Sequence, residues 1–324
     1  MNFNHKRVFV CATALAILAP LLITVYLLFW SPHDISASQT GNQRVFGATY
    51  MTMNNPYYEL MDAQLRAEIE ARGDVLLTRD AAMDQDRQNE EILELIDAGV
   101  CAIFLTPVEW DTSKAGLEIA AEAGVPVIVV DAPVRDEALA ACSVLSDNYQ
   151  AGVLCAQHLM SVRDSAKILL LEHITARSGA ERIQGFKDTI AGHDGFVILD
   201  SGESDGQIEN AMPVMEELLR RHPEADTLMA QRPQRVRRAA AIQGAGLSER
   251  FLVYSVDGSP EGKALVNGHL LTATCAQFPY KVAEEAVRQG YQAIDGGCEQ
   301  HEIIVPVELI TEENVERYGL DGWQ

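Results

Sequence analysis

Polar side chains suited to binding a small solute stand at the ends of the apolar runs in this sequence. If these runs are parallel strands, ligands bind outside their carboxyl ends, so these side chains would gather at one edge of a sheet. Carboxylates accept hydrogen bonds, amides donate and accept them, and a guanidinium carries five donors. We therefore expect hydrogen bonding to a small polar solute. The residues after the runs are Asn54, Asn55, Thr106, Asp131, the stretch 172–182 that ends in Arg182, Arg232, Asp257 and Gln277.

The segments that would position these side chains alternate between strand length and helical period. Such alternation is typical of parallel sheets with helices on both faces, so the sequence predicts an α/β protein with two doubly wound parallel-sheet lobes. The expected strands are 45–48, 75–77, 101–105, 125–130, 168–171, 196–199, 227–230, 251–256 and 271–276. The expected helices are 57–72, 84–98, 113–123, 149–161, 179–190, 207–221, 235–245 and 281–294.

The N-terminal segment determines the expected compartment. Residues 8–30 carry no charge, follow Lys6 and Arg7, and exceed the roughly 20 residues that span a bilayer core. A cleaved signal peptide is the alternative, but its apolar region normally has only about 7 to 15 residues. We expect a single-pass cell-membrane protein with a cytoplasmic N-terminus at 1–7, a transmembrane helix at 8–30, a linker at 31–43 and extracytoplasmic binding lobes.

Charge and composition argue against several function classes. The chain has 47 acidic and 25 basic residues, a formal charge of -22, which would repel nucleic acid. Its six cysteines form no C-x-x-C pair and no metal-like cluster with histidines, so we expect no metal and no cofactor. It contains no P-loop, nucleophile elbow or H-E-x-x-H motif, and we expect a protein that is not an enzyme.

Seven motifs at run ends and helix starts resemble a known family in their types and order. They are M-N-N-P-Y-Y (53–58), V-I-V-V-D (127–131), S-D-N (146–148), A-E-R-I-Q-G-F (180–186), M-A-Q (229–231), S-V-D-G-S-P (255–260) and T-A-T-C-A-Q-F-P (272–279). With them the chain resembles the periplasmic sugar-binding proteins of the ribose-binding type, the type I periplasmic binding proteins with a lac-repressor-like ligand-binding fold. The resemblance implies one lobe of residues 44–147 plus 278–308 and another of 148–277 plus 309–324, with the ligand between them.

The resemblance also implies which residues contact the ligand. Aromatic faces would cover the C–H side of a sugar ring, and carboxylates and an Arg fork would bind its hydroxyls. Alternatively, the two tyrosines pack in the core and the two aspartates serve as turn residues or helix caps. The implied contacts are Asn55, Tyr57, Tyr58, Asp131, Arg182, Asp257 and Gln277.

Four positions depart from the family pattern. Ala132 stands where the family commonly has Arg, Gly206 where an aromatic is expected, and Gln231-Arg232 where Asn-Asp is usual. Arg232 at a strand end that opens a helix would favour an acidic ligand. The alternative is that Arg232 belongs to a solvated helix start with the arginines that follow it.

Two functions share this expected site. The first is a solute-binding protein that delivers a sugar or sugar derivative to an ABC-type importer. The second is a membrane-tethered sensor that reports ligand occupancy to a signalling partner such as a histidine kinase. The uncleaved anchor and the altered pocket are the features that favour sensing.

Overall fold

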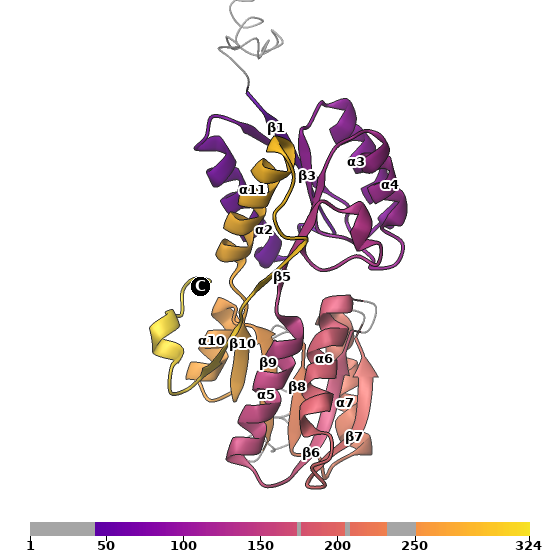
Figure 1. Cartoon of the computed structure of the whole chain (residues 1–324). Coiled ribbons are helices and arrows are strands. Elements are labelled where there is room, and N and C mark those ends of the chain that lie inside the picture. Colours follow the sequence, from indigo (N-terminus) through magenta and orange to yellow (C-terminus); the bar gives the residue numbers. More distant parts are fainter. Residues whose placement is uncertain (1–42, 174–175, 205–207, 232–250) are drawn as a thin grey trace, which may run out of the picture. The chain divides into compact units, whose positions relative to one another are not determined.

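The computed structural model describes residues 43–173, 176–204, 208–231 and 251–324 (Figure 1). The strands are β1 (Val45–Tyr50), β2 (Val75–Asp80), β3 (Ala102–Leu105), β4 (Val127–Asp131), β5 (Cys142–Ser146), β6 (Ala166–Glu172), β7 (Phe196–Glu203), β8 (Thr227–Ala230), β9 (Leu252–Asp257), β10 (Ala273–Ala276), β11 (Glu302–Val305) and β12 (Glu308–Thr311). The helices are α2 (Pro56–Glu70), α3 (Gln85–Asp97), α4 (Lys114–Glu122), α5 (Asn148–Val162), α6 (Arg177–Ile190), α7 (Ile208–Arg221), α10 (Pro260–Asn267) and α11 (Pro279–Asp295).

Two expected helices fall outside this part of the chain. The segment 8–30, expected as a transmembrane helix, and the helix expected at 235–245 both lie outside the described residues. Among the residues that the structure does describe, no helix combines the length and the apolar character needed to cross a membrane.

The described strands form two six-stranded sheets. The first has the order β11-β5-β4-β3-β1-β2, and all of its neighbours are parallel. The second has the order β12-β10-β9-β8-β6-β7 and is parallel except for β12, which runs antiparallel to β10. Two α/β lobes with parallel sheets, as predicted from the alternation of runs, are therefore confirmed, with one antiparallel edge strand that the sequence did not predict.

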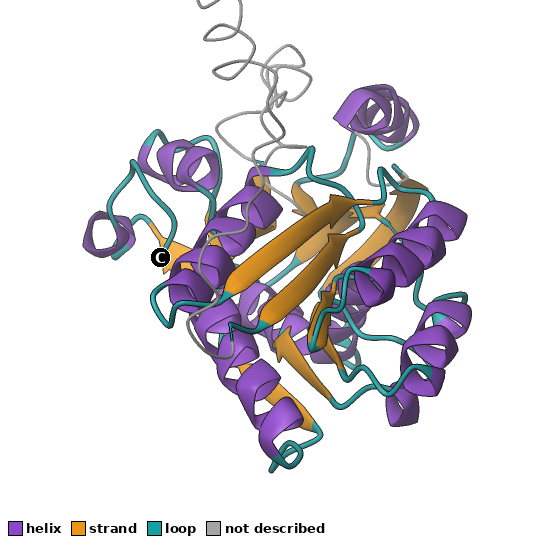
Figure 2. Ribbon diagram, turned by 90° about the horizontal axis from the view of Figure 1, so that it is seen from above, coloured by secondary structure: helices purple, strands orange, loops and turns teal. Residues whose placement is uncertain are grey.

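Each sheet is buried on both faces, which is why its strands are almost continuously apolar. In the first sheet Phe104 and Val130 face the cluster made with α2 and α11, whereas Leu105 and Val129 face the cluster made with α3 and α4. The second sheet is covered by α5 and α6 on one face and by α7 and α10 on the other. Helices accordingly flank strands on both sides when the molecule is viewed from above (Figure 2).

Four elements were not predicted from the sequence. The strands β11 and β12 have four residues each, and each pairs in a different sheet, so tertiary pairing rather than a local pattern determines them. The strand β5 is a short run, C-S-V-L-S, with two polar residues. The helix α10 did have a local signal, because Ser259 caps it by accepting from Gly262 N, and Pro260 occupies its first turn.

The chain passes between the two sheets three times. The first passage follows β5 at Asp147, whose side chain caps α5 by accepting from Gln150 N at 2.9 Å. The second lies at Gln277, between β10 and α11, which packs against the first sheet. The third lies between β11 and β12, and Glu308 already belongs to the second sheet.

The helices α5 and α6 approach each other closely because glycines stand at their crossing. A Cβ atom at Gly152 would lie 1.9 Å from the carbonyl oxygen of Arg182, and one at Gly185 would lie 2.1 Å from the carbonyl oxygen of Tyr149. Because glycine has no side chain, the two helix backbones can pack this closely, and the crossing positions the part of α6 that carries Arg182.

We predict that Gly152→Ala and Gly185→Ala each destabilise the protein by about 1 to 3 kcal/mol, because the added methyl group must push two helix backbones apart. Urea unfolding of the full chain measures this change. The exposed Gln157→Ala change on α5 is the control and should leave the unfolding midpoint in place. An unchanged midpoint for Gly152→Ala would contradict the close crossing.

Candidate functional site

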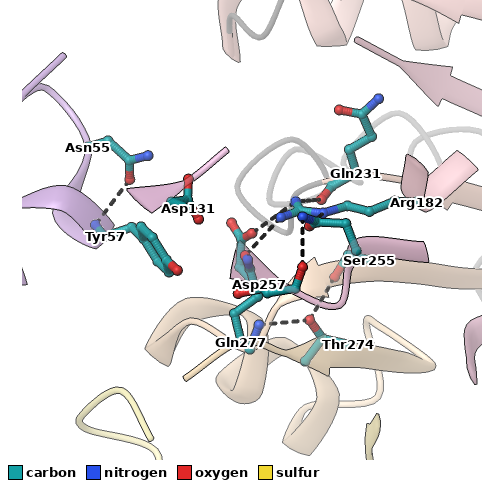
Figure 3. Close-up of polar contacts among 12 residues, drawn as sticks. Asn55, Tyr57, Asp131, Arg182, Gln231, Ser255, Asp257, Thr274 and Gln277 are labelled. Atoms are coloured by element: carbon teal, nitrogen blue, oxygen red, sulfur yellow. Dashed lines mark hydrogen bonds and ion pairs between the residues drawn. The ribbon is translucent and has the colours of Figure 1, made fainter. Parts of the chain in front are cut away.

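A single buried guanidinium organises the polar residues of the second lobe (Figure 3). Arg182 is 4% exposed. Its Nε donates to Asn148 Oδ1 at 2.8 Å, and its Nη2 donates to Gln277 Oε1 at 2.9 Å. Its Nη1 donates to the Gln231 carbonyl at 3.2 Å and to Asp257 Oδ1 at 3.3 Å. One side chain of α6 thus connects the start of α5 with the ends of β8, β9 and β10.

The parallel order of β8, β9 and β10 explains this convergence. Gln231 directly follows β8, Asp257 is the last residue of β9, and Gln277 directly follows β10. Carboxyl ends of neighbouring parallel strands share one edge of the sheet, so residues distant in sequence meet there. The strand-end rule therefore predicted that Asp257 and Gln277 meet, whereas Arg182 reaches this edge from α6.

The polar residues of the first lobe form a second group. Tyr58 donates its hydroxyl to Asp131 Oδ2 at 3.0 Å, and the ring of Tyr57 packs edge-on against that of Tyr58 at 5.5 Å. Asn55 caps α2 by accepting from Tyr57 N at 3.1 Å. Both tyrosines belong to the core cluster of this lobe, so their rings pack in the core, which is the alternative that the sequence left open. Asn55 and Tyr57 at the start of α2 nevertheless lie near Asp131 at the end of β4 (Figure 3), and Tyr58 joins them through its bond to Asp131.

The two aspartates occupy corresponding positions and share an uncommon backbone. Asp131 ends β4 with φ of 72°, and Asp257 ends β9 with φ of 114°. Residues other than glycine rarely adopt positive φ, and such strain concentrates at binding and catalytic sites. Asp257 does not cap the helix that follows it, because Ser259 does. Both carboxylates are more than nine-tenths buried, which fits a role in holding a partner.

Two buried amide nitrogens near these groups, those of Gln231 and Gln277, have no hydrogen-bond partner among the described residues. The Tyr57 hydroxyl has the Ser146 hydroxyl and the Asp131 carboxylate as hydrogen-bond neighbours. Burial, followed by the nearby Asp131 carboxylate, raises the pKa of Tyr57 well above its ordinary value, so the phenol keeps its proton. Each unsatisfied buried donor costs about 1 to 3 kcal/mol, and a ligand that carries oxygen acceptors would satisfy them.

Thr106 and Arg232 are the remaining predicted site residues. Thr106 is buried at the end of β3, where its carbonyl accepts from Gln88 Nε2 at 3.0 Å. Arg232 and Gly206 lie outside the described residues. In the described part of the chain no three His, Cys, Asp or Glu side chains are placed to hold a metal ion.

A cavity of about 420 Å³ lies beside the first-lobe group. Its wall includes Ala132, directly after Asp131, and Met51, whose sulfur accepts from the Tyr58 hydroxyl at 3.4 Å. Arg177 stacks over the Trp110 ring with its guanidinium carbon 5.4 Å from the ring centroid. The lining residues are Met51, Met83, Pro107, Val108, Glu109, Trp110, Asp111, Ala132, Pro133, His173, Ala176 and Arg177.

Sequence reasoning missed several residues of this site. Met51 and Gln231 directly follow β1 and β8, so the rule that identified Asp131 could have found them, whereas Trp110 lies five residues after β3. Asn148 belongs to the S-D-N motif but was not among the predicted site residues; Asp147 caps α5, and Asn148 holds Arg182.

A family model described as periplasmic binding protein domain matches residues 46–298. The chain belongs to this family. The family predicted from the seven motifs is thereby confirmed, and it is a family of solute-binding proteins. Family membership supports the expectation that the protein is not an enzyme, although only indirectly.

Relatives with curated names cover most of the chain. The ribose import binding protein of Escherichia coli K12 is 26% identical over 265 residues, which are 81% of this chain and 88% of that protein. The ribose import binding protein of Bacillus subtilis 168 is 27% identical over 287 residues, or 87% of this chain and 92% of that protein.

Solved structures share the fold of this periplasmic binding protein. An ABC transporter solute binding protein from Bacillus halodurans C-125 with bound myo-inositol has a TM-score of 0.80 at 23% identity, covering 86% of this chain and 99% of that one. A periplasmic solute binding protein from Actinobacillus succinogenes 130z with bound D-allose has a TM-score of 0.78 at 22% identity, covering 86% of this chain and 100% of that one. At these identities the likeness establishes the fold.

We predict that Arg182→Met destabilises the protein by about 3 to 5 kcal/mol, because it leaves the Asp257 carboxylate buried without its charged partner. Urea unfolding measures the loss. Arg220→Met is the matched control, since the Arg220 side chain is 72% exposed and its ion pair with Glu217 lies at the surface. If Arg182→Met were as stable as the control, the guanidinium would not be the organising charge.

Proposed function

We propose that this periplasmic binding protein captures a small uncharged polyol, a sugar or sugar derivative, between the strand-end groups of its two lobes. The observation that carries the proposal is the pair of buried unpartnered amide donors at Gln231 and Gln277 beside two buried carboxylates. A sugar offers an oxygen acceptor and a hydroxyl donor at nearly every carbon, so it can satisfy both kinds of group.

The geometry suits selective binding because the site is already ordered. Four hydrogen bonds hold the guanidinium of Arg182, so little side-chain freedom is lost when a ligand arrives. A ligand without a hydroxyl group in the required place would leave a buried donor or carboxylate unpaired, and such mismatches discriminate strongly between ligands.

Delivery to an ABC-type importer is the role that we propose for the captured ligand. The names of the relatives support it, since they include ribose and D-apiose import binding proteins. The binding lobes would face the outside of the cytoplasmic membrane, tethered by residues 8–30, whose lack of charge supports a membrane anchor.

We predict that the full chain binds a neutral sugar or inositol, and that Asp131→Asn weakens the affinity about 10- to 100-fold, because a hydrogen bond to a charged acceptor becomes a neutral one. Calorimetric titration with D-ribose, D-allose and myo-inositol measures this change. Arg220→Met serves as the surface control. An Asp131→Asn protein with wild-type affinity would remove Asp131 from the ligand site.

A further inference from the structure

The last seven residues of the chain, 318–324, form a segment that we call the C-terminal strap. Lys263 of α10 anchors it: this fully buried side chain donates through Nζ to the carbonyl of Tyr318 at 3.1 Å and to that of Gly322 at 2.6 Å. Burial lowers the pKa of Lys263. A buried ammonium needs such acceptors, so the anchor fixes the strap to the second lobe.

The end of the strap reaches the strand ends that hold Arg182. Gln324 donates through Nε2 to the carbonyl of Gln277 at 2.7 Å and approaches the carbonyl of Asp257 at 3.4 Å. The same amide nitrogen would lie 2.7 Å from a Cβ atom at Gly258, so it fits closely against the turn after β9. Gln324 therefore holds the backbone of Asp257 and Gln277, whose side chains are two of the four groups bonded to Arg182.

The residue before it contacts the other lobe. The ring of Trp323 lies edge-on to that of Tyr57, with centroids 5.4 Å apart and planes at 70°. Trp323 packs against the core cluster of the first lobe, which also contains Tyr58. Tyr57 in turn packs against Tyr58, whose hydroxyl binds Asp131. Two consecutive strap residues thus contact the polar groups of both lobes.

We propose that Trp323 and Gln324 are positioning residues for the ligand site, an inference that rests on the proposed function. Trp323 sets the ring of Tyr57, and with it the direction of a buried hydroxyl close to the Asp131 carboxylate. Gln324 sets the separation of the ends of β9 and β10. Both residues are only half-buried, so truncating either side chain lowers the stability of the whole protein less than truncating a core side chain does. We therefore expect the main effect of such a truncation at the ligand site.

The first arm of the test measures affinity. Calorimetric titration of the full chain with D-ribose, D-allose and myo-inositol should show Trp323→Ala binding about tenfold more weakly than wild type, as expected for loss of an aromatic pair. Trp323→Phe, which keeps an aromatic edge, should recover most of the affinity. Leu320→Ala is the matched control, because Leu320 is an exposed apolar residue of the same strap.

The second arm needs no ligand. Hydrogen exchange measured by mass spectrometry should be faster in Trp323→Ala at residues 56–61, and faster in Gln324→Ala at residues 257–262 and 277–280, than in wild type or Leu320→Ala. Unchanged exchange would overturn the positioning role, and so would faster exchange with unchanged affinity. If wild type bound none of the three compounds, the proposed function would fail, and exchange alone would decide whether the strap positions these residues.

Discussion

Moving a guanidinium out of water costs several kcal/mol unless partners compensate for it, and Arg182 is 4% exposed. Its compensation comes from one carboxylate, two side-chain amide oxygens and one carbonyl oxygen, which belong to four different elements. These acceptors can surround one guanidinium only if β8, β9 and β10 end at the same edge of the sheet. They also require α6 to lie close to α5, which the glycines at the crossing permit.

The first lobe repeats this arrangement with different residues. A buried carboxylate ends a central strand in each lobe, and both aspartates have positive φ. In the second lobe the carboxylate pairs with Arg182, and in the first Asp131 accepts from Tyr58. The unpartnered amide donors, Gln231 and Gln277, follow strands of the second sheet. The strap residues Trp323 and Gln324 contact both groups, Trp323 through Tyr57 and Gln324 through the Gln277 carbonyl.

Much of this site follows from the sequence, because a local pattern is sufficient where a residue directly follows a buried strand. Asp131, Asp257 and Gln277 were identified in that way. A local pattern is not sufficient where a residue can have either of two roles. Asn148 stands at a helix start, where it could be a cap, and only the packing of α5 against α6 shows that it holds Arg182. Trp323 and Gln324 had no signal at all, since their partners are distant in sequence. The four-residue strands β11 and β12 depend on tertiary pairing for the same reason.

The central claim is that the two strand-end groups bind one polyol between them. A crystal structure of the full chain with its tightest-binding sugar tests it most directly, through the distances from the sugar oxygens to the carboxylates of Asp131 and Asp257. The account predicts hydrogen bonds of about 2.5 to 3.2 Å from one sugar to both carboxylates. A sugar bound to one lobe alone, or bound elsewhere while Gln231 and Gln277 keep unpartnered donors, would contradict it.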